Sequence, residues 1–150
     1  MVIPPQRSNR LLNFIMIMMC ALSLNAAPIE SSKVQKFRTD ISDQQLIEVL
    51  DRSHRRIFGE EPSKNRLAMA WAQVAFENGR GRKVFNHNLG NIGLAPRMKA
   101  PFYHYGAGIF LVFPEFKAGA VAYWQTVQKC TVALAAFEQL DPTRAAHAFH

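Results

Sequence analysis

The sequence has only two cysteines and no apolar run long enough to span a bilayer. Cys130 is the only cysteine after residue 27, so no disulfide can form within residues 28–150, and its thiol is expected to be buried, reactive or missing its partner. The longest largely apolar stretch, residues 11–24, has 14 residues. A spanning helix needs about 20. We therefore expect no stable membrane insertion once this stretch is removed.

Residues 1–27 have the pattern of a secretory signal peptide. Arg7 and Arg10 precede the apolar stretch, and small residues at positions 25–27 offer a cleavage site. The pattern predicts a periplasmic or secreted protein, with an uncleaved N-terminal anchor as the alternative. Residues 28–40 are polar and aperiodic, which indicates a linker.

The mature chain is basic. Without the signal peptide, 16 Lys and Arg residues face 11 Asp and Glu residues. A basic exported protein meets anionic polymers of the cell envelope more readily than nucleic acid. We therefore expect no nucleic-acid partner, although charge alone leaves that class open and an intracellular location would favour it.

Residues 41–150 are expected to form one domain. Ser42 and Gln45 form a capping box before a helix that ends at Gly59, and a second helix runs from Ser63 to about Gly79. Glycine, proline and short apolar stretches over residues 80–113 predict a small antiparallel sheet. Further helices are expected from Pro114, over residues 132–140, and from residue 142 to the end. The fold class is α+β and mostly helical. Because the last helix has no stop signal, we expect truncation at the C-terminus.

Glu77 is the first candidate for chemistry. It ends a helical stripe that is apolar apart from Gln73, and both burial and the negative end of the helix dipole favour a carboxyl group that keeps its proton. A general acid that cleaves a glycosidic bond needs this property. The alternative is a surface side chain paired with Arg80.

An asparagine-rich turn follows this helix. Asn88, Gly90 and Asn91 belong to it, and amide side chains bond hydroxyl and acetamido groups without charge. Tyr103 and Tyr105 are candidates for stacking on sugar rings, and packing beneath the sheet is the alternative for them. No cysteine or carboxylate completes a metal set with the histidines, so neither a metal nor another cofactor is expected.

Three stretches in this order carry a family resemblance: "ENGRG" from Glu77, "NLGNI" from Asn88, and "IFLVFPEFKAGAVAYW" from Ile109. Over residues 63–129 the chain resembles the glucosaminidase-domain family of bacterial peptidoglycan hydrolases, which has a lysozyme-like fold. The resemblance implies that Glu77 is the proton donor in an exported hydrolase of the endo-β-N-acetylglucosaminidase type, acting on the β-1,4 bonds of glycan strands. It also implies that Asn88 and Gly90 help to build the sugar cleft.

The chain departs from the family pattern in two ways. Leu111 and Phe113 stand where relatives often carry arginine and tyrosine, and no Asp or Glu lies between Glu77 and Glu115. Glu115 is thus the only nearby candidate for a second carboxylate, although its place at a helix start is explained by the dipole. A one-acid scheme with substrate assistance is favoured. A lytic transglycosylase, an amidase-class hydrolase and a catalytically degenerate wall-binding or envelope-assembly protein remain alternatives.

Overall fold

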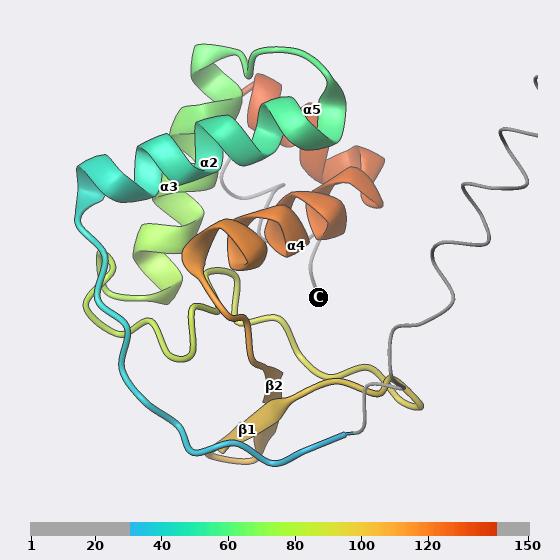
Figure 1. Ribbon diagram of the computed structural model, residues 1–150. Coiled ribbons are helices and arrows are strands. Elements are labelled where there is room, and N and C mark those ends of the chain that lie inside the picture. Colours follow the sequence, from blue (N-terminus) through green and yellow to red (C-terminus); the bar gives the residue numbers. More distant parts are fainter. Residues whose placement is uncertain (1–30, 141–150) are drawn as a thin grey trace, which may run out of the picture.

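Four helices and one β hairpin make up the described part of the chain, residues 31–140 of this computed structural model (Figure 1). The α+β, mostly helical class predicted from the sequence is confirmed. The predicted signal peptide and the predicted helix after residue 142 lie outside the described residues. Among the described helices, none has the length and apolar character needed to cross a membrane.

The first two helices begin and end where local signals predict. Helix α2, Asp43–Phe58, starts with the capping box between Ser42 and Gln45 and ends at Gly59, whose φ is 75°. Helix α3, Lys64–Glu77, starts at Ser63, whose hydroxyl accepts a hydrogen bond from the Arg66 backbone. These caps satisfy backbone groups that a helix end leaves unpaired, so they act without tertiary contacts.

The core lies between α2, α3 and the two C-terminal helices, α4 (Phe116–Gln128) and α5 (Thr131–Glu138). Trp124 of α4 is fully buried and donates from its indole nitrogen to the Leu50 carbonyl of α2 at 2.8 Å. Helix α4 begins two residues after the proline that was predicted to open it, because Glu115 keeps an extended backbone as the N-cap.

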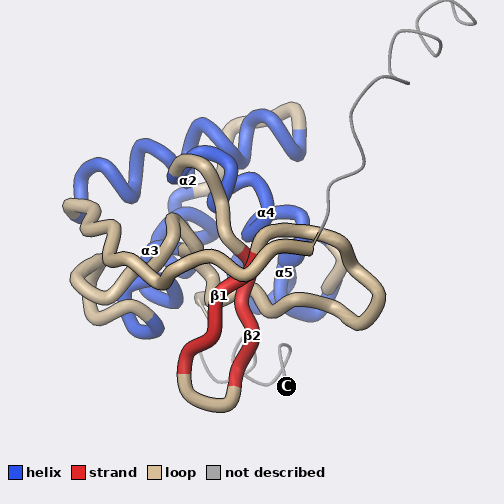
Figure 2. The backbone as a smooth tube through the Cα atoms, turned by 60° about the horizontal axis from the view of Figure 1, so that its bottom comes forward, coloured by secondary structure: helices blue, strands red, loops and turns tan. Residues whose placement is uncertain are grey.

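Strands β1, Phe102–Tyr105, and β2, Gly108–Leu111, form an antiparallel hairpin (Figure 2). This hairpin is the small sheet that the sequence predicts. An isolated bridge between Gly93 and Phe110 attaches the preceding loop to it. The hairpin and the loop before it, together residues 78–111, lie below the helices in Figure 1, and we call them the β lobe.

The described part of the predicted linker, residues 31–40, is fastened to this lobe. The Val34 amide donates to the Phe102 carbonyl at 2.7 Å, and the Thr39 amide donates to the Val84 carbonyl at 2.8 Å. Thr39 itself is buried. The sequence predicted a linker here because residues 31–40 are polar and aperiodic. Their backbone hydrogen bonds to the lobe do not depend on side-chain hydropathy, so the sequence pattern does not reveal them.

Candidate functional site

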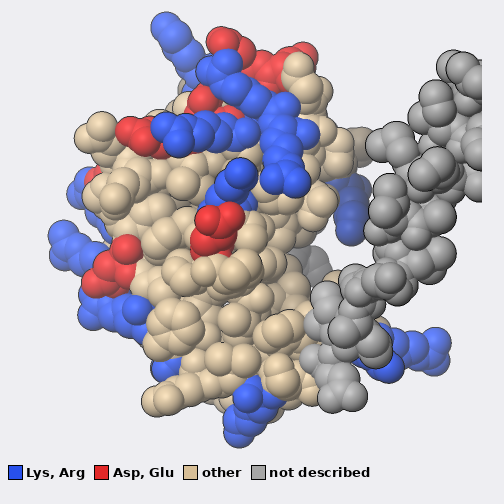
Figure 3. Space-filling model, viewed as in Figure 1, with Lys and Arg blue, Asp and Glu red and all other residues tan. Residues whose placement is uncertain are grey.

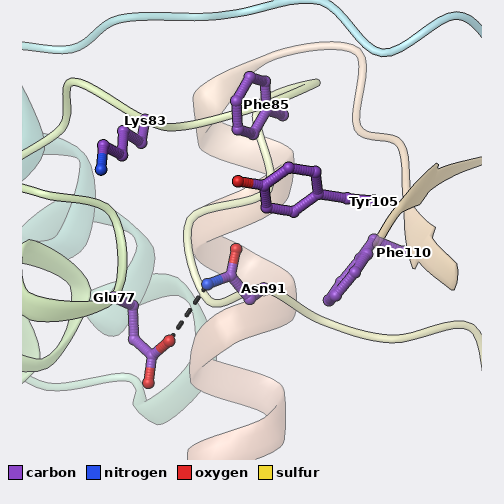
Figure 4. Close-up of a pocket in the computed structure, with 6 residues that line it drawn as sticks. All are labelled: Glu77, Lys83, Phe85, Asn91, Tyr105 and Phe110. Atoms are coloured by element: carbon purple, nitrogen blue, oxygen red, sulfur yellow. Dashed lines mark hydrogen bonds between the residues drawn. The ribbon is translucent and has the colours of Figure 1, made fainter. Parts of the chain in front are cut away.

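A pocket of about 190 Å³ lies where the end of α3 meets the β lobe (Figure 4). Glu77 and Lys83 lie on one side of it, and the aromatic rings lie on the other. The residues that line it are Glu77, Lys83, Phe85, Asn91, Tyr105 and Phe110. The pocket thus brings together an acidic residue, a lysine, an asparagine and three aromatic rings. Rings with a few polar groups are typical of a ligand site.

Glu77 is exposed, so the expectation that it is buried is wrong. The buried stripe of α3 runs through Val74 and passes on to Asn78, which is the residue that turns inward. The Asn78 amide donates to the carbonyls of Val74 and Leu89. Glu77 therefore projects beyond the core, into the pocket.

The alternative of an ion pair between Glu77 and Arg80 is not observed either. Arg80 has a φ of 58° and pairs with Asp43 at 2.6 Å. Within residues 31–140, every Asp and Glu other than Glu77 and Glu115 has an arginine within ion-pair distance. The only hydrogen bond of the Glu77 carboxylate among these residues comes from the Asn91 side-chain amide, at 3.2 Å. The carboxylate at the pocket is thus left open to a ligand.

The asparagine-rich turn places its two candidates differently. Asn88 is completely buried: its amide donates to the Ile92 and Leu111 carbonyls, and its oxygen accepts from the Ile92 backbone at 2.7 Å. It holds the turn and cannot reach a ligand, which corrects its expected role in binding. Asn91 has a φ of 46° and lines the pocket.

Gly90 does not line the pocket, and its small size serves packing. A Cβ atom at this position would lie 2.9 Å from a ring carbon of Tyr123. Tyr123 is itself buried and donates from its hydroxyl to Gln73 at 2.8 Å. Burial raises the pKa of Tyr123 well above its ordinary value, so it remains a neutral hydrogen-bond donor.

The two tyrosines of β1 also have different roles. Tyr103 is buried and stacks on Phe110 with ring centroids 5.6 Å apart, and burial raises its pKa to about 12. It supports the pocket from behind, so its expected contact with a ligand is wrong. Tyr105 is 53% exposed and lines the pocket beside Phe85, with ring centroids 5.4 Å apart.

Glu115 is the N-cap of α4, where its side chain makes no capping hydrogen bond. It does not line the pocket with Glu77. A paired-carboxylate mechanism needs a separation of about 5–10 Å across one bound sugar. The pocket itself offers one carboxylate.

No cluster of metal-ligating side chains forms within residues 31–140. Sequence reasoning did not single out Lys83, Phe85 or Phe110 as lining residues. For Phe110 a signal was available, because alternate side chains of a strand face the same side and Phe110 pairs with Tyr103 across the hairpin. Lys83 and Phe85 carried no comparable signal, because the turn after α3 decides where they face.

Comparisons of the chain with protein-family models, with curated proteins and with solved structures give no match.

Proposed function

We propose that this protein is an exported peptidoglycan hydrolase of the endo-β-N-acetylglucosaminidase type, with Glu77 as its general acid. The observation that carries the proposal is the position of Glu77: it lines a pocket with aromatic rings and an amide, and no cation within residues 31–140 holds it in an ion pair. Aromatic rings and amide groups are the surfaces that recognise sugar rings and acetamido groups.

The chemistry follows from what the pocket contains. Glu77 donates its proton to the leaving oxygen of the glycosidic bond. A sugar ring that covers the pocket displaces water from Glu77. Since the pocket has no second carboxylate, the carbonyl oxygen of the substrate's own 2-acetamido group attacks the anomeric carbon as its bond to the leaving oxygen breaks. Water then attacks this carbon, the bond to the acetamido oxygen breaks, and the water's proton goes to Glu77, which restores the acid and leaves a reducing end.

Substitution of Glu77 tests this proposal. Glu77→Gln keeps the size and the hydrogen-bonding capacity of the side chain but removes the acid. We expect it to abolish the clearing of purified cell walls in a zymogram and in a turbidity assay, with an unchanged melting temperature. Glu115→Gln is the matched control, because Glu115 is also exposed and is also without an ion pair within residues 31–140.

Full clearing by Glu77→Gln would remove Glu77 from the mechanism. Mass spectrometry of the released fragments then identifies the reaction. A reducing end means hydrolysis, an anhydro product means lytic transglycosylation, and a free stem peptide means amidase chemistry.

A wall-binding protein without catalysis is the second candidate. Two observations favour it: Glu77 is exposed, and Glu115 lies outside the pocket. Such a protein would sediment with purified peptidoglycan and leave its turbidity unchanged. The net positive charge of the sequence suits either candidate, because the bacterial wall is anionic.

A further inference from the structure

Residues 31–40 cross from the hairpin to the segment after α3 and are fixed at both ends of this crossing. At the hairpin, the Val34 amide donates to the Phe102 carbonyl at 2.7 Å. At the other end, the Thr39 amide donates to the Val84 carbonyl at 2.8 Å. The part of the chain between these two attachments is therefore held against the β lobe.

The backbone on either side of Lys36 is held by one buried residue, Asn86. The Asn86 side-chain amide donates to the Gln35 carbonyl at 3.1 Å, and its side-chain oxygen accepts from the Phe37 amide at 3.1 Å. The Asn86 backbone amide donates to the Phe37 carbonyl at 3.0 Å. Because Asn86 directly follows Phe85, these bonds keep the Lys36 backbone next to that ring.

The Lys36 ammonium nitrogen lies over two rings of the pocket. It is 4.1 Å from the Tyr105 ring centroid and 4.5 Å from the Phe85 ring centroid, and the two centroids are 5.4 Å apart. Both rings line the pocket, whereas Lys36 does not. In Figure 4 residues 31–40 are the pale blue ribbon along the upper edge, on the side of the rings away from Glu77. Lys36 thus contacts the rings from outside the pocket.

This contact with rings distinguishes Lys36 from the other lysines. No lysine within residues 31–140 has an ion pair, so an unpaired ammonium group is not informative by itself. Among the lysines of these residues, only Lys36 has its nitrogen over an aromatic ring. In Figure 3 the surface around the hairpin shows basic side chains and no acidic ones on the face in view. The negative faces of the two rings attract the ammonium group.

Tyr105 depends on this contact because of its place in the hairpin. It is the last residue of β1, pairs with Gly108 across the hairpin and is 53% exposed. Glycine offers no side chain against which the ring could pack. Within residues 31–140, the ring and cation contacts of Tyr105 are those with Phe85 and Lys36. Lys36 therefore joins the tip of the hairpin to the segment after α3.

We propose that residues 31–40 support one wall of the pocket and that Lys36 is a positioning residue for ligand binding. Its ammonium group keeps the Tyr105 and Phe85 rings in the arrangement on which a ring of the ligand stacks. A wall that is ordered beforehand improves affinity, because less conformational freedom is lost on binding. This inference rests on the proposed function, which supplies the ligand, but it concerns binding and not proton transfer by Glu77.

An uncharged ligand tests this role, because it has no charge for Lys36 to attract. The dissociation constant of N,N′-diacetylchitobiose is measured on the full chain by chemical-shift titration. Clearing of purified cell walls gives the maximal rate and the wall concentration at half-maximal rate. Lys36→Gln removes the charge and keeps most of the aliphatic stem. We expect it to raise the dissociation constant and the half-maximal wall concentration about two- to five-fold, with an unchanged maximal rate.

Three further chains separate the cation over the rings from overall charge. Lys36→Arg keeps a cation there and should behave as the wild type. Lys33→Gln is the matched control: it removes the same charge from the same segment, and Lys33 contacts no ring within residues 31–140. In a chain that carries Tyr105→Leu, Lys36→Gln should weaken binding much less than in the wild type, because one of the two rings is absent.

The outcomes distinguish this inference from the proposed function. If the wild type binds and clears and Lys36→Gln matches it, or lowers only the maximal rate, the role of Lys36 is overturned and the proposed function stands. Equal weakening by Lys33→Gln, or no rescue by Lys36→Arg, also overturns that role alone.

A wild type that neither binds the disaccharide nor clears walls overturns both the inference and the proposed function. A wild type that binds without clearing overturns the hydrolase alone, and the dissociation constants then decide the role of Lys36. If walls are cleared without measurable disaccharide binding, the half-maximal wall concentrations decide it.

Discussion

The side-chain amide of Asn91 donates a hydrogen bond of 3.2 Å to Glu77 Oε2, and so joins the turn before the hairpin to the end of α3. Asn91 holds this position with a left-handed backbone, φ 46°. The turn that presents it is anchored by the buried Asn88. The candidate acid is therefore hydrogen-bonded to a lining residue from a different segment of the chain.

Two substitutions at Asn91 separate the amide from the backbone. Asn91→Gly and Asn91→Ala both remove the bond to Glu77, so we expect both to lower wall-clearing activity. Glycine accepts a left-handed φ, whereas alanine is strained there by about 1–2 kcal/mol. The alanine variant should therefore unfold at a lower urea concentration than the glycine variant. Equal activity of Asn91→Gly and wild type would show that Glu77 needs no positioning by this amide.

His54 makes the stability of the protein depend on pH. It is fully buried, its Nε2 accepts from Arg66 at 2.9 Å, and its Nδ1 donates to the Glu60 carbonyl at 3.1 Å. This pairing requires the neutral ring, since the Arg66 guanidinium can only donate. Burial above all lowers the pKa of His54 below its ordinary value of 6.5. The hydrogen bond with the Glu60 carbonyl opposes this effect, the Arg66 charge adds to it, and the charges of Glu60 and Asp51 oppose it more weakly.

The unfolded chain therefore binds a proton at His54 that the folded chain resists. The contribution of the neutral His54 to stability is fully present above pH 6.5. It is lost as the pH falls from 6.5 toward the lower pKa that His54 has in the folded chain. We expect the urea concentration at the unfolding midpoint of the wild type to decrease when the pH is lowered from 7.5 to 5.5. His54→Gln should reduce this dependence. A parallel pH dependence in both proteins would contradict the assignment to His54.

Asn86 fastens the N-terminal segment to the β lobe. Its amide donates to the Gln35 carbonyl at 3.1 Å, and its side-chain oxygen accepts from the Phe37 amide at 3.1 Å. Asn86→Gly suits the φ of 52° and removes both bonds. Hydrogen exchange over residues 33–40 should accelerate by about 30-fold, since the two lost bonds contribute about 1 kcal/mol each. Asn91→Gly is the matched control and should leave this exchange unchanged.

Gly119 allows α4 to approach the turn that carries His87. A Cβ atom at Gly119 would lie 2.0 Å from the His87 carbonyl oxygen, so one of the two backbones would have to move. We expect Gly119→Ala to lower the free energy of unfolding by about 3 kcal/mol, at the upper end for overpacking. Denaturant titration measures the loss.

Gly59→Ala provides a comparison for this effect. A Cβ atom at Gly59 would meet nothing within 4 Å, but its φ is 75°. Its cost should be limited to backbone strain of about 1–2 kcal/mol. A smaller loss for Gly119→Ala than for Gly59→Ala would show that α4 can shift away from the turn.

Both ends of α2, the start of α3 and the helical class were predictable from the sequence. Ser42, Gln45, Gly59 and Ser63 act on backbone groups within a few residues of themselves, so their effect does not depend on the rest of the fold. The hairpin was predictable for the same reason, from alternation and glycines over a short range. These features confirm the α+β class.

The tertiary structure decided which candidate residues line the pocket and which are buried. Asn88 and Asn91 have the same side chain, yet one is buried and the other lines the pocket, because left-handed residues at Asn86, His87 and Asn91 decide the path of the turn. Glu77 ends an apolar stripe and is nevertheless exposed, because the chain turns at Asn78.

The sequence by itself determined where α2 begins and ends, where α3 begins, and which residues were candidates for the chemistry. Only the tertiary structure decided that Lys83 and Phe85 join Glu77 at a pocket, and that residues 31–40 are fastened to the β lobe. The physical reason is range: capping and periodicity act over one or two turns of chain, whereas a pocket is formed by segments that meet only after packing.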